Sequence, residues 1–314
     1  MMNEHSGEPA FARPSLATPG DYFALLKPRV MSLVIFTALT GVAMSSVPVN
    51  PVIAFAALLA IAVGAGASGA FNMAADADID ARMARTRNRP IPAGRVTREE
   101  AFAFAMPLAA GSALTLGVVA NWLSAGLLAF TIFFYAVVYT RWLKRTTPQN
   151  IVIGGAAGAL PPLIGETAMT GEIGIAGLVL FAIIFLWTPP HFWALALVKS
   201  DDYARAGVPM MPNVAGESST RLQILVYTLI LAPAALAPVA LDFGGRAYAL
   251  VASLSGAVLV WRAWRVYRDR EGAAARRSCW RLFGFSILYL FLLFATLLAE
   301  RLAGPVSAIV GRAA

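Results

Sequence analysis

The chain has 314 residues, of which 59% are hydrophobic and 13% charged, and its mean hydropathy is +0.69. Soluble domains carry roughly 25% charged residues, so a soluble fold of this composition could not hide its apolar surface from water. The composition excludes a secreted or cytosolic globular domain and a disordered chain, and the single cysteine, Cys279, excludes a disulfide framework.

Residues 1–20 are polar and predict a short tail, because Glu4 and Glu8 do not suit the basic start of a cleaved signal. Nine apolar runs follow, each close to the ~20 residues that cross ~30 Å of hydrocarbon as a helix. Since lipid offers backbone amides no other partners, we predict an all-α bundle of nine transmembrane helices. This bundle forms one intramembrane domain over residues 21–304, followed by a short tail over 305–314. The runs cover about residues 30–47, 52–75, 101–121, 122–140, 151–169, 173–198, 222–241, 247–261 (short, unless it continues to Trp264) and 282–299.

Positive charges fall almost entirely on one side of this arrangement. If the N-terminus lies inside, 22 of the 25 Lys and Arg residues fall in inside segments, and only Arg246, Arg301 and Arg312 fall outside. This is the positive-inside pattern of membrane proteins. It predicts a cytoplasmic N-terminus and a periplasmic C-terminus in the cytoplasmic (inner) membrane of a bacterium. It also accounts for the pI near 10.1 without a nucleic-acid partner.

The second apolar run ends in a stretch of amide, acidic and basic residues. Asn72, Asp76 and Asp80 are spaced i, i+4 and i+8, so their side chains share one face of a helix. Acids at a membrane boundary are costly unless cations neutralise them. Carboxylate and amide oxygens suit Mg²⁺, and the six arginines within residues 82–98 suit phosphate oxygens. The stretch therefore predicts a metal-bridged diphosphate site; the alternative is a solvated loop whose acids and arginines pair with one another.

Several motifs indicate a family. The pattern N-x-x-x-D-x-D-x-D followed by R-T-R-N-R-P resembles the first aspartate-rich motif of the UbiA-type intramembrane prenyltransferases. The rest of the chain most resembles the branch of that family that farnesylates haem. The match runs from about Lys27 to Gly216. It includes K-P-R at 27–29, T-P-Q-N-I-V-I-G-G at 147–155, W-T-P-P-H-F-W-A-L at 187–195 and D-Y-x-x-A-G-V-P-M at 202–210.

The second aspartate-rich motif of the family is incomplete in this sequence. Many UbiA-type enzymes carry D-x-x-x-D there, whereas Asp202 is followed four residues later by Ala206, and Asp201 lies beside it. Asp201, Asp202 and Tyr203 are therefore candidates for a reduced second motif. We expect the two acids either to bind one Mg²⁺ with fewer carboxylates or to hold a lysine or arginine.

The resemblance implies transfer of the farnesyl group of farnesyl diphosphate to a vinyl group of haem B. Water adds as well, giving haem O and diphosphate for haem–copper terminal oxidases. Haem B is then a substrate, and Mg²⁺ is the cofactor, held by Asn72, Asp76, Asp80 and Asp202. Implied partners are membrane lipid and a downstream haem A synthase or oxidase assembly. The candidates for binding the diphosphate, all near inside helix ends, are Arg29, Arg85, Arg89, Lys144 and Arg145.

His191 joins Asn72, Asp76 and Asp80 as a candidate catalytic residue. It follows Pro189 and Pro190 in the sixth run, and these prolines interrupt the helical hydrogen bonds. An ionisable group about eight residues (~12 Å) from the end of a span is a functional-site hypothesis by default. His191 either ligates the haem iron or accepts a proton from water, and a purely structural role is the alternative.

Three other functions fit parts of the sequence. A transporter of a phosphorylated lipid would place ionisable groups near the membrane midplane, where these spans are poor in acids. An assembly factor would not need an Asn and Asp face beside six arginines. Prenylation of an aromatic quinone precursor is disfavoured by the stretch from Trp187 to Trp193, which resembles the haem branch.

Overall fold

The computed structural model describes residues 17–310, with side chains described to residue 304. Within that range every regular element is a helix, which confirms the predicted all-α fold. In chain order the elements are α1 (Pro19–Leu25), α2 (Pro28–Ala43), α3 (Pro51–Ala75), α4 (Ala77–Arg82), α5 (Arg98–Val119), α6 (Trp122–Phe133), the π-helix η2 (Phe134–Leu143), α7 (Lys144–Thr146), α8 (Asn150–Thr170), α9 (Ile175–Val198), α10 (Ser200–Arg205), α11 (Met211–Val214), α12 (Glu217–Ala234), α13 (Ala237–Ala240), α14 (Arg246–Arg268) and α15 (Gly272–Val310).

The spans correspond in order to the nine predicted runs. Among the described residues, eight helices are long and apolar enough to cross a membrane, and the pair α1 and α2 makes a ninth if counted as one span. That pair is bent by 50° at a break around Lys27. Several spans are longer than predicted; for example, α14 continues past Trp264 to Arg268, and α15 begins at Gly272.

Of the predicted tails, residues 1–20 and 305–314, residues 1–16 and 311–314 lie outside the described residues. Helix α1 begins at Pro19, within the first tail, where Thr18 and Asp21 form a capping box. Helix α15 continues to Val310, within the second. Helical structure therefore passes both predicted boundaries of the domain.

Short polar signals determine where several spans begin. The Oδ1 atom of Asn50 accepts a hydrogen bond from the amide of Val52 at 2.9 Å, and Pro51 then opens α3. At the tight turn between α5 and α6, Asn121 caps α6 through the amide of Ser124 at 2.9 Å. The Nδ2 group of Asn121 also donates to the carbonyl of Thr167 at 2.8 Å, so this turn is tied to the end of α8.

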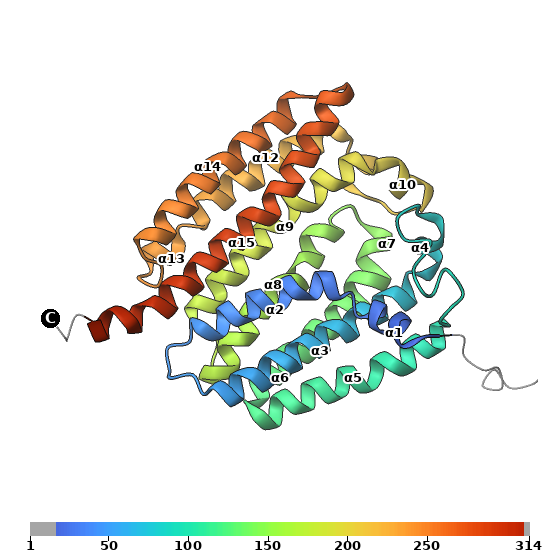
Figure 1. Cartoon of the computed structure of the whole chain (residues 1–314). Coiled ribbons are helices and arrows are strands. Elements are labelled where there is room, and N and C mark those ends of the chain that lie inside the picture. Colours follow the sequence, from blue (N-terminus) through green and yellow to red (C-terminus); the bar gives the residue numbers. More distant parts are fainter. Residues whose placement is uncertain (1–16, 311–314) are drawn as a thin grey trace, which may run out of the picture.

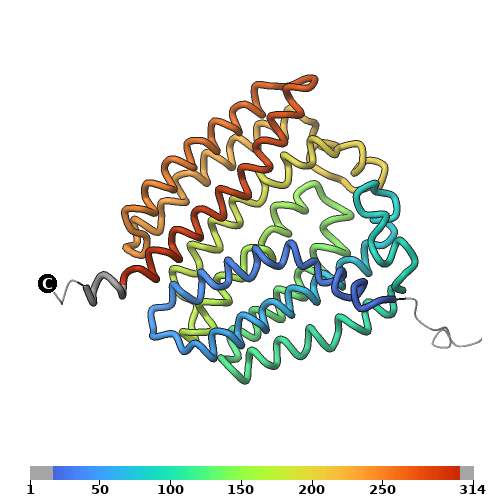
Figure 2. Tube along the Cα trace, in the orientation of Figure 1, coloured from blue at the N-terminus to red at the C-terminus, as the bar shows by residue number. Residues whose placement is uncertain are grey.

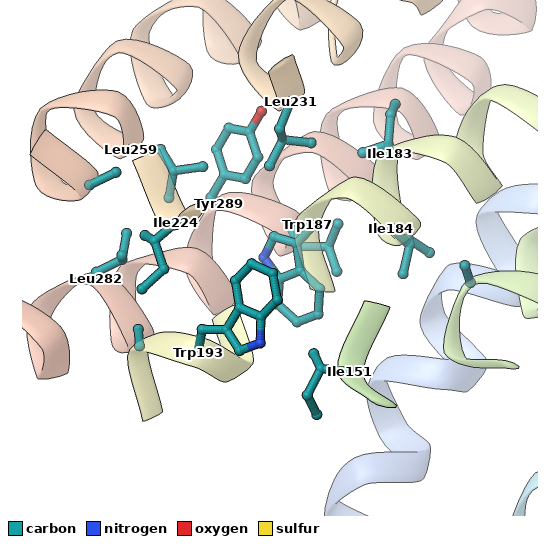
Figure 3. Packing of buried hydrophobic residues seen from close by; sticks show 14 of the residues in the cluster. Ile151, Ile183, Ile184, Trp187, Trp193, Ile224, Leu231, Leu259, Leu282 and Tyr289 are labelled. Carbon is teal, nitrogen blue, oxygen red and sulfur yellow. The ribbon is translucent and has the colours of Figure 1, made fainter. Parts of the chain in front are cut away.

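The buried apolar side chains form two groups, one in each half of the chain. The first lies mainly among α3, α5, α6 and α8, and the second among α9, α12, α14 and α15. Figure 2 traces the backbone of these helices from the blue and green part of the chain to the yellow and red part. Trp187, Trp193 and Tyr289 belong to the second group (Figure 3). Helix α8 is the most buried of the described spans. Helix α2 packs closely on it, because a Cβ atom at Gly41 would collide with the backbone of Pro162.

The outside of the bundle is apolar, as expected of a surface in contact with lipid. Large side chains such as Phe55, Val118 and Leu254 are mostly exposed there. The short helices α4, α7 and α10 gather at one end of the bundle, and α15 ends at the opposite end (Figure 1). The polar motifs found in the sequence are therefore collected at one end.

Candidate active site

The predicted polar face at the end of α3 is present and almost fully buried. Asn72, Asp76 and Asp80 are 4%, 0% and 2% exposed. Asp76 lies between α3 and α4, and the amide of Asp80 donates to its carbonyl at 2.8 Å, so the i, i+4 spacing continues across the junction. The Nδ2 group of Asn72 donates to Oδ2 of Asp76 at 2.7 Å. Asp78, by contrast, is exposed and pairs with Arg145.

Each member of the polar face has its own cationic partner. The Nζ atom of Lys27 donates to Oδ1 of Asn72 at 2.5 Å, and Nζ of Lys144 lies 2.5 Å from Oδ2 of Asp76. A guanidinium nitrogen of Arg89 lies 2.7 Å from Oδ2 of Asp80. Buried charges require such compensation, because an unpaired buried ion is strongly destabilising. Three separate segments of the chain therefore bring cations to a single face, and Arg145, next to Lys144, also lies 3.9 Å from Oδ1 of Asp76.

Lys27 is a site residue that is not among the candidates predicted from the sequence. It lies at the break between α1 and α2, and its backbone adopts a left-handed conformation with φ 52°. That conformation is costly for a residue with a long side chain and persists only where the surroundings require it. The K-P-R motif before the first span was the available signal for its role.

Thr140 was also omitted from the predicted site. It lies in η2, where its hydroxyl donates to the carbonyl of Tyr135, five residues earlier, at 2.7 Å. The same oxygen accepts a hydrogen bond from Nδ2 of Asn72 at 3.0 Å. π-Helical turns are rare and often occur at functional sites. Apolar periodicity alone did not reveal this one, and Thr140 was therefore not recognised.

The five predicted diphosphate-binding cations occupy different positions. Arg89 and Lys144 contact the polar face, whereas Arg29 and Arg85 are exposed and form no ion pair with a described residue. Arg145 donates to both carboxylate oxygens of Asp78, at 2.8 and 2.9 Å. These bonds hold the pKa of the Asp78 carboxyl at about 2, below its ordinary value of 3.8.

The polar face has the donor groups that Mg²⁺ requires. The Oδ1 atom of Asp76 is buried and accepts no hydrogen bond from a described residue. Carboxylate oxygens of Asp76 and Asp80 and the amide oxygen of Asn72 are hard ligands of the type that Mg²⁺ selects. Within residues 17–304, no three His, Cys, Asp or Glu side chains come together as a metal-binding group. A metal here would thus have few protein carboxylates and would leave positions for substrate oxygens.

The reduced second motif lies at α10, at the same end of the bundle (Figure 1). Asp202 is buried and forms an ion pair with Arg205 one turn later, while Asp201 is exposed. Tyr203 is partly buried against the core of the C-terminal half. Of the two alternatives for these acids, the described arrangement has Asp202 holding an arginine.

His191 is 7% exposed and lies between α9 and α15. Its Nδ1 atom is 2.7 Å from Oγ of Ser286. The rings of Trp187 and Phe283 stack on the imidazole, with centroid distances of 4.3 and 4.5 Å. Phe192 meets it edge-on at 5.0 Å. No ion pair to His191 is formed by any described residue, so this region differs in character from the charged end of α3.

Comparison with known proteins gives consistent matches over most of the chain. Residues 34–303 match the UbiA prenyltransferase family. A protein named protoheme IX farnesyltransferase from Methylobacterium sp. (strain 4-46) is 66% identical over 294 residues, which is 93% of each chain. One of the same name from Azorhizobium caulinodans is 61% identical over 303 residues, covering 96% of this chain and 99% of that relative.

Solved structures show the same fold at low sequence identity. The structure of a digeranylgeranylglyceryl phosphate synthase has a TM-score of 0.75 at 14% identity, over 90% of this chain and 98% of its own. A UbiA homolog from Archaeoglobus fulgidus bound to GPP and Mg²⁺ has a TM-score of 0.59 at 16% identity, over 88% and 99% of the two chains.

Proposed function

Because the chain belongs to the UbiA prenyltransferase family, we propose that it is a protohaem IX farnesyltransferase. It transfers the farnesyl group of farnesyl diphosphate to a vinyl group of haem B with addition of water, and it releases haem O and diphosphate. Relatives of 61–66% identity that cover almost the whole chain favour this reaction over prenylation of a quinone precursor and over transport.

The observation that carries the chemistry is that every member of the polar face of α3 and α4 has a cationic partner. Diphosphate leaves only when the charge that develops on its oxygens is neutralised. Lys27, Lys144 and Arg89 already lie within 2.5–2.7 Å of oxygens on this face. They bind the diphosphate oxygens that approach the same face, and Arg29, Arg85 and Arg145 extend the positive surface around it.

Asn72, Asp76 and Asp80 would hold Mg²⁺, and Oδ1 of Asp76, which is buried and accepts no hydrogen bond from a described residue, supports this assignment. When bound, the ion supplies Lewis-acid neutralisation of the diphosphate. Asp202 is paired with Arg205, so its part in holding a metal requires that this ion pair open.

The reaction breaks the bond between farnesyl C1 and its diphosphate oxygen and forms a carbon–carbon bond to the haem vinyl group. Water then adds at the neighbouring carbon and loses a proton. The stacked rings of Tyr135 and Tyr139, whose centroids are 5.3 Å apart, lie beside the polar face. Their faces stabilise the allylic cation, because a ring quadrupole attracts positive charge. His191 acts on the haem side.

The chain is an integral membrane protein, and we place it in the bacterial cytoplasmic membrane with α4 and α10 on the cytoplasmic side. The arginine-rich segments at that end of the bundle support this orientation, with a cytoplasmic N-terminus and a periplasmic C-terminus. A haem A synthase or an oxidase assembly would receive the product.

The test is a mass spectrum. The purified protein in lipid receives haem B, farnesyl diphosphate and Mg²⁺, and the extracted haems are compared with and without EDTA. We expect a haem heavier by one farnesyl group plus water, which is absent when EDTA is present. Unchanged haem in a protein that binds both substrates would favour a quinone-precursor acceptor, and failure to bind either substrate would favour transport.

A further inference from the structure

The ring of His191 is fixed by contacts from two helices. Trp187 on α9 and Phe283 on α15 are within 20° of parallel to the imidazole at centroid distances of 4.3 and 4.5 Å. Two rings this close to parallel, at these distances, must occupy opposite faces of the imidazole. The indole nitrogen of Trp187 also donates to the carbonyl of Ser286 at 2.7 Å. Ser286 therefore contacts both the imidazole and one of the rings that clamp it.

The hydrogen bonds of Ser286 determine which nitrogen of His191 carries the proton. A serine hydroxyl has one proton to donate. Oγ of Ser286 donates it to the carbonyl of Phe283 at 2.7 Å. At its 2.7 Å contact with Nδ1 of His191 the hydroxyl must then accept, so Nδ1 carries the imidazole proton. Nε2 is left with a lone pair.

Nε2 is available to an incoming group. No described residue forms a hydrogen bond with Nε2. Nε2 is also not one of the polar atoms that are fully buried from solvent and lack a hydrogen-bond partner. The indole nitrogen of Trp193 and the hydroxyl of Tyr289, by contrast, are buried and have no hydrogen-bond partner among the described residues. Nε2 thus combines an accessible lone pair with a ring that cannot turn, which is the arrangement of a metal-binding histidine held by its other nitrogen.

We propose that Ser286 is a positioning residue that fixes His191 in the Nδ1-protonated form, so that Nε2 serves as axial ligand to the iron of the haem substrate. This deepens the proposed function and depends on haem being the substrate. Ligation suits the surroundings better than proton uptake does. It leaves the imidazole neutral, whereas a protonated ring would be a buried charge with no described carboxylate in contact.

The test uses the full chain in lipid nanodiscs, titrated with ferric haem B and followed by the Soret band. We expect His191→Ala to lose the band shift that distinguishes ligated haem from haem dissolved in lipid, and added imidazole to restore it. Ser286→Val should raise the Kd for haem about 10- to 100-fold, the usual cost of losing a partner of a metal-binding histidine. Ser286→Thr differs from it by one hydroxyl and should remain close to wild type.

Ser255→Ala is a matched control, because this serine on α14 is also buried and donates only to a carbonyl of its own helix. It should change neither the Kd nor the spectrum. Equal affinities of the Ser286 valine and threonine variants would overturn the proposal, as would an unshifted band in wild type or a normal band in His191→Ala. If the wild type forms farnesylated haem but the spectra differ from these expectations, only this inference fails. If the spectra agree but no product forms, the proposed function fails.

Discussion

The end of α3 and the stack around His191 hold buried polar groups by different means. At the end of α3, the carboxylates of Asp76 and Asp80 are compensated by Lys144 and Arg89. Between α9 and α15, the imidazole of His191 has a hydroxyl partner, two aromatic rings stacked on it and a third edge-on, with no ion pair to a described residue.

This difference fits the two substrates of the proposed reaction. A diphosphate carries several charges, and a face built from paired charges can exchange its cations between carboxylates and phosphate oxygens. The macrocycle of haem is flat and largely apolar with one metal at its centre, and an apolar surface with a single nitrogen lone pair suits this part of the molecule. One region thus serves the leaving group and the other the acceptor.

The strongest test of this division is the removal of charge at the end of α3. The double variant Asp76→Asn, Asp80→Asn should lower the rate of haem O formation by more than about 10³-fold, because the metal ligands and the anchors of the cations are lost together. Its haem spectrum should match wild type. Asp78→Asn is the matched control, since Asp78 is exposed in the same segment, and it should retain most activity. Loss of the wild-type haem spectrum in the double variant would show that the end of α3 also takes part in binding haem, against this division.

Breaking one ion pair tests whether the charges also stabilise the fold. Lys144→Met leaves Asp76 buried without its nearest cation, and we expect a loss of about 3 kcal/mol in stability. Adding Asp76→Asn should recover most of that loss without recovering activity. Thermal unfolding in detergent measures both variants. Equal stability of Lys144→Met and wild type would show that Asp76 is already compensated by another group, such as Arg145.

The exposed arginines should have smaller effects. Arg85→Gln removes a cation that pairs with no described residue, so the fold should be unchanged. We expect the KM for farnesyl diphosphate to rise about tenfold at most, or roughly 1.4 kcal/mol, with the Kd for haem unaltered. Steady-state kinetics with each substrate varied in turn provides the measurement. A change in haem affinity alone would show that Arg85 contributes to binding haem and not farnesyl diphosphate.

The smallest effect concerns pH. Hydrogen bonds from Arg145 lower the pKa of Asp78 from 3.8 to about 2, so their stabilisation is present above the ordinary pKa and is lost as the pH falls through about 2. The difference in unfolding temperature between wild type and Asp78→Asn should therefore be constant above about pH 5 and vanish near pH 2. A difference that stays constant down to pH 2 would contradict the role of this ion pair.

The sequence predicted the spans well, because a span is a local property of some twenty apolar residues. It also predicted the face formed by Asn72, Asp76 and Asp80, since helical spacing alone puts them together. Lys27 was missed as a site residue because its role depends on a contact with Asn72 from 45 residues away. The π-helix that turns Thr140 towards Asn72 left no distinct mark in the apolar periodicity.

By itself the sequence determined the all-α membrane fold, the charge asymmetry and the family, because composition, spacing and motifs are fixed by the order of residues. Which cation meets which acid was decided only by the tertiary structure. So was the hydrogen bond between His191 on α9 and Ser286 on α15, two residues 95 positions apart. Contacts of this kind depend on how helices pack, and packing is determined by the shapes of all the side chains at an interface together.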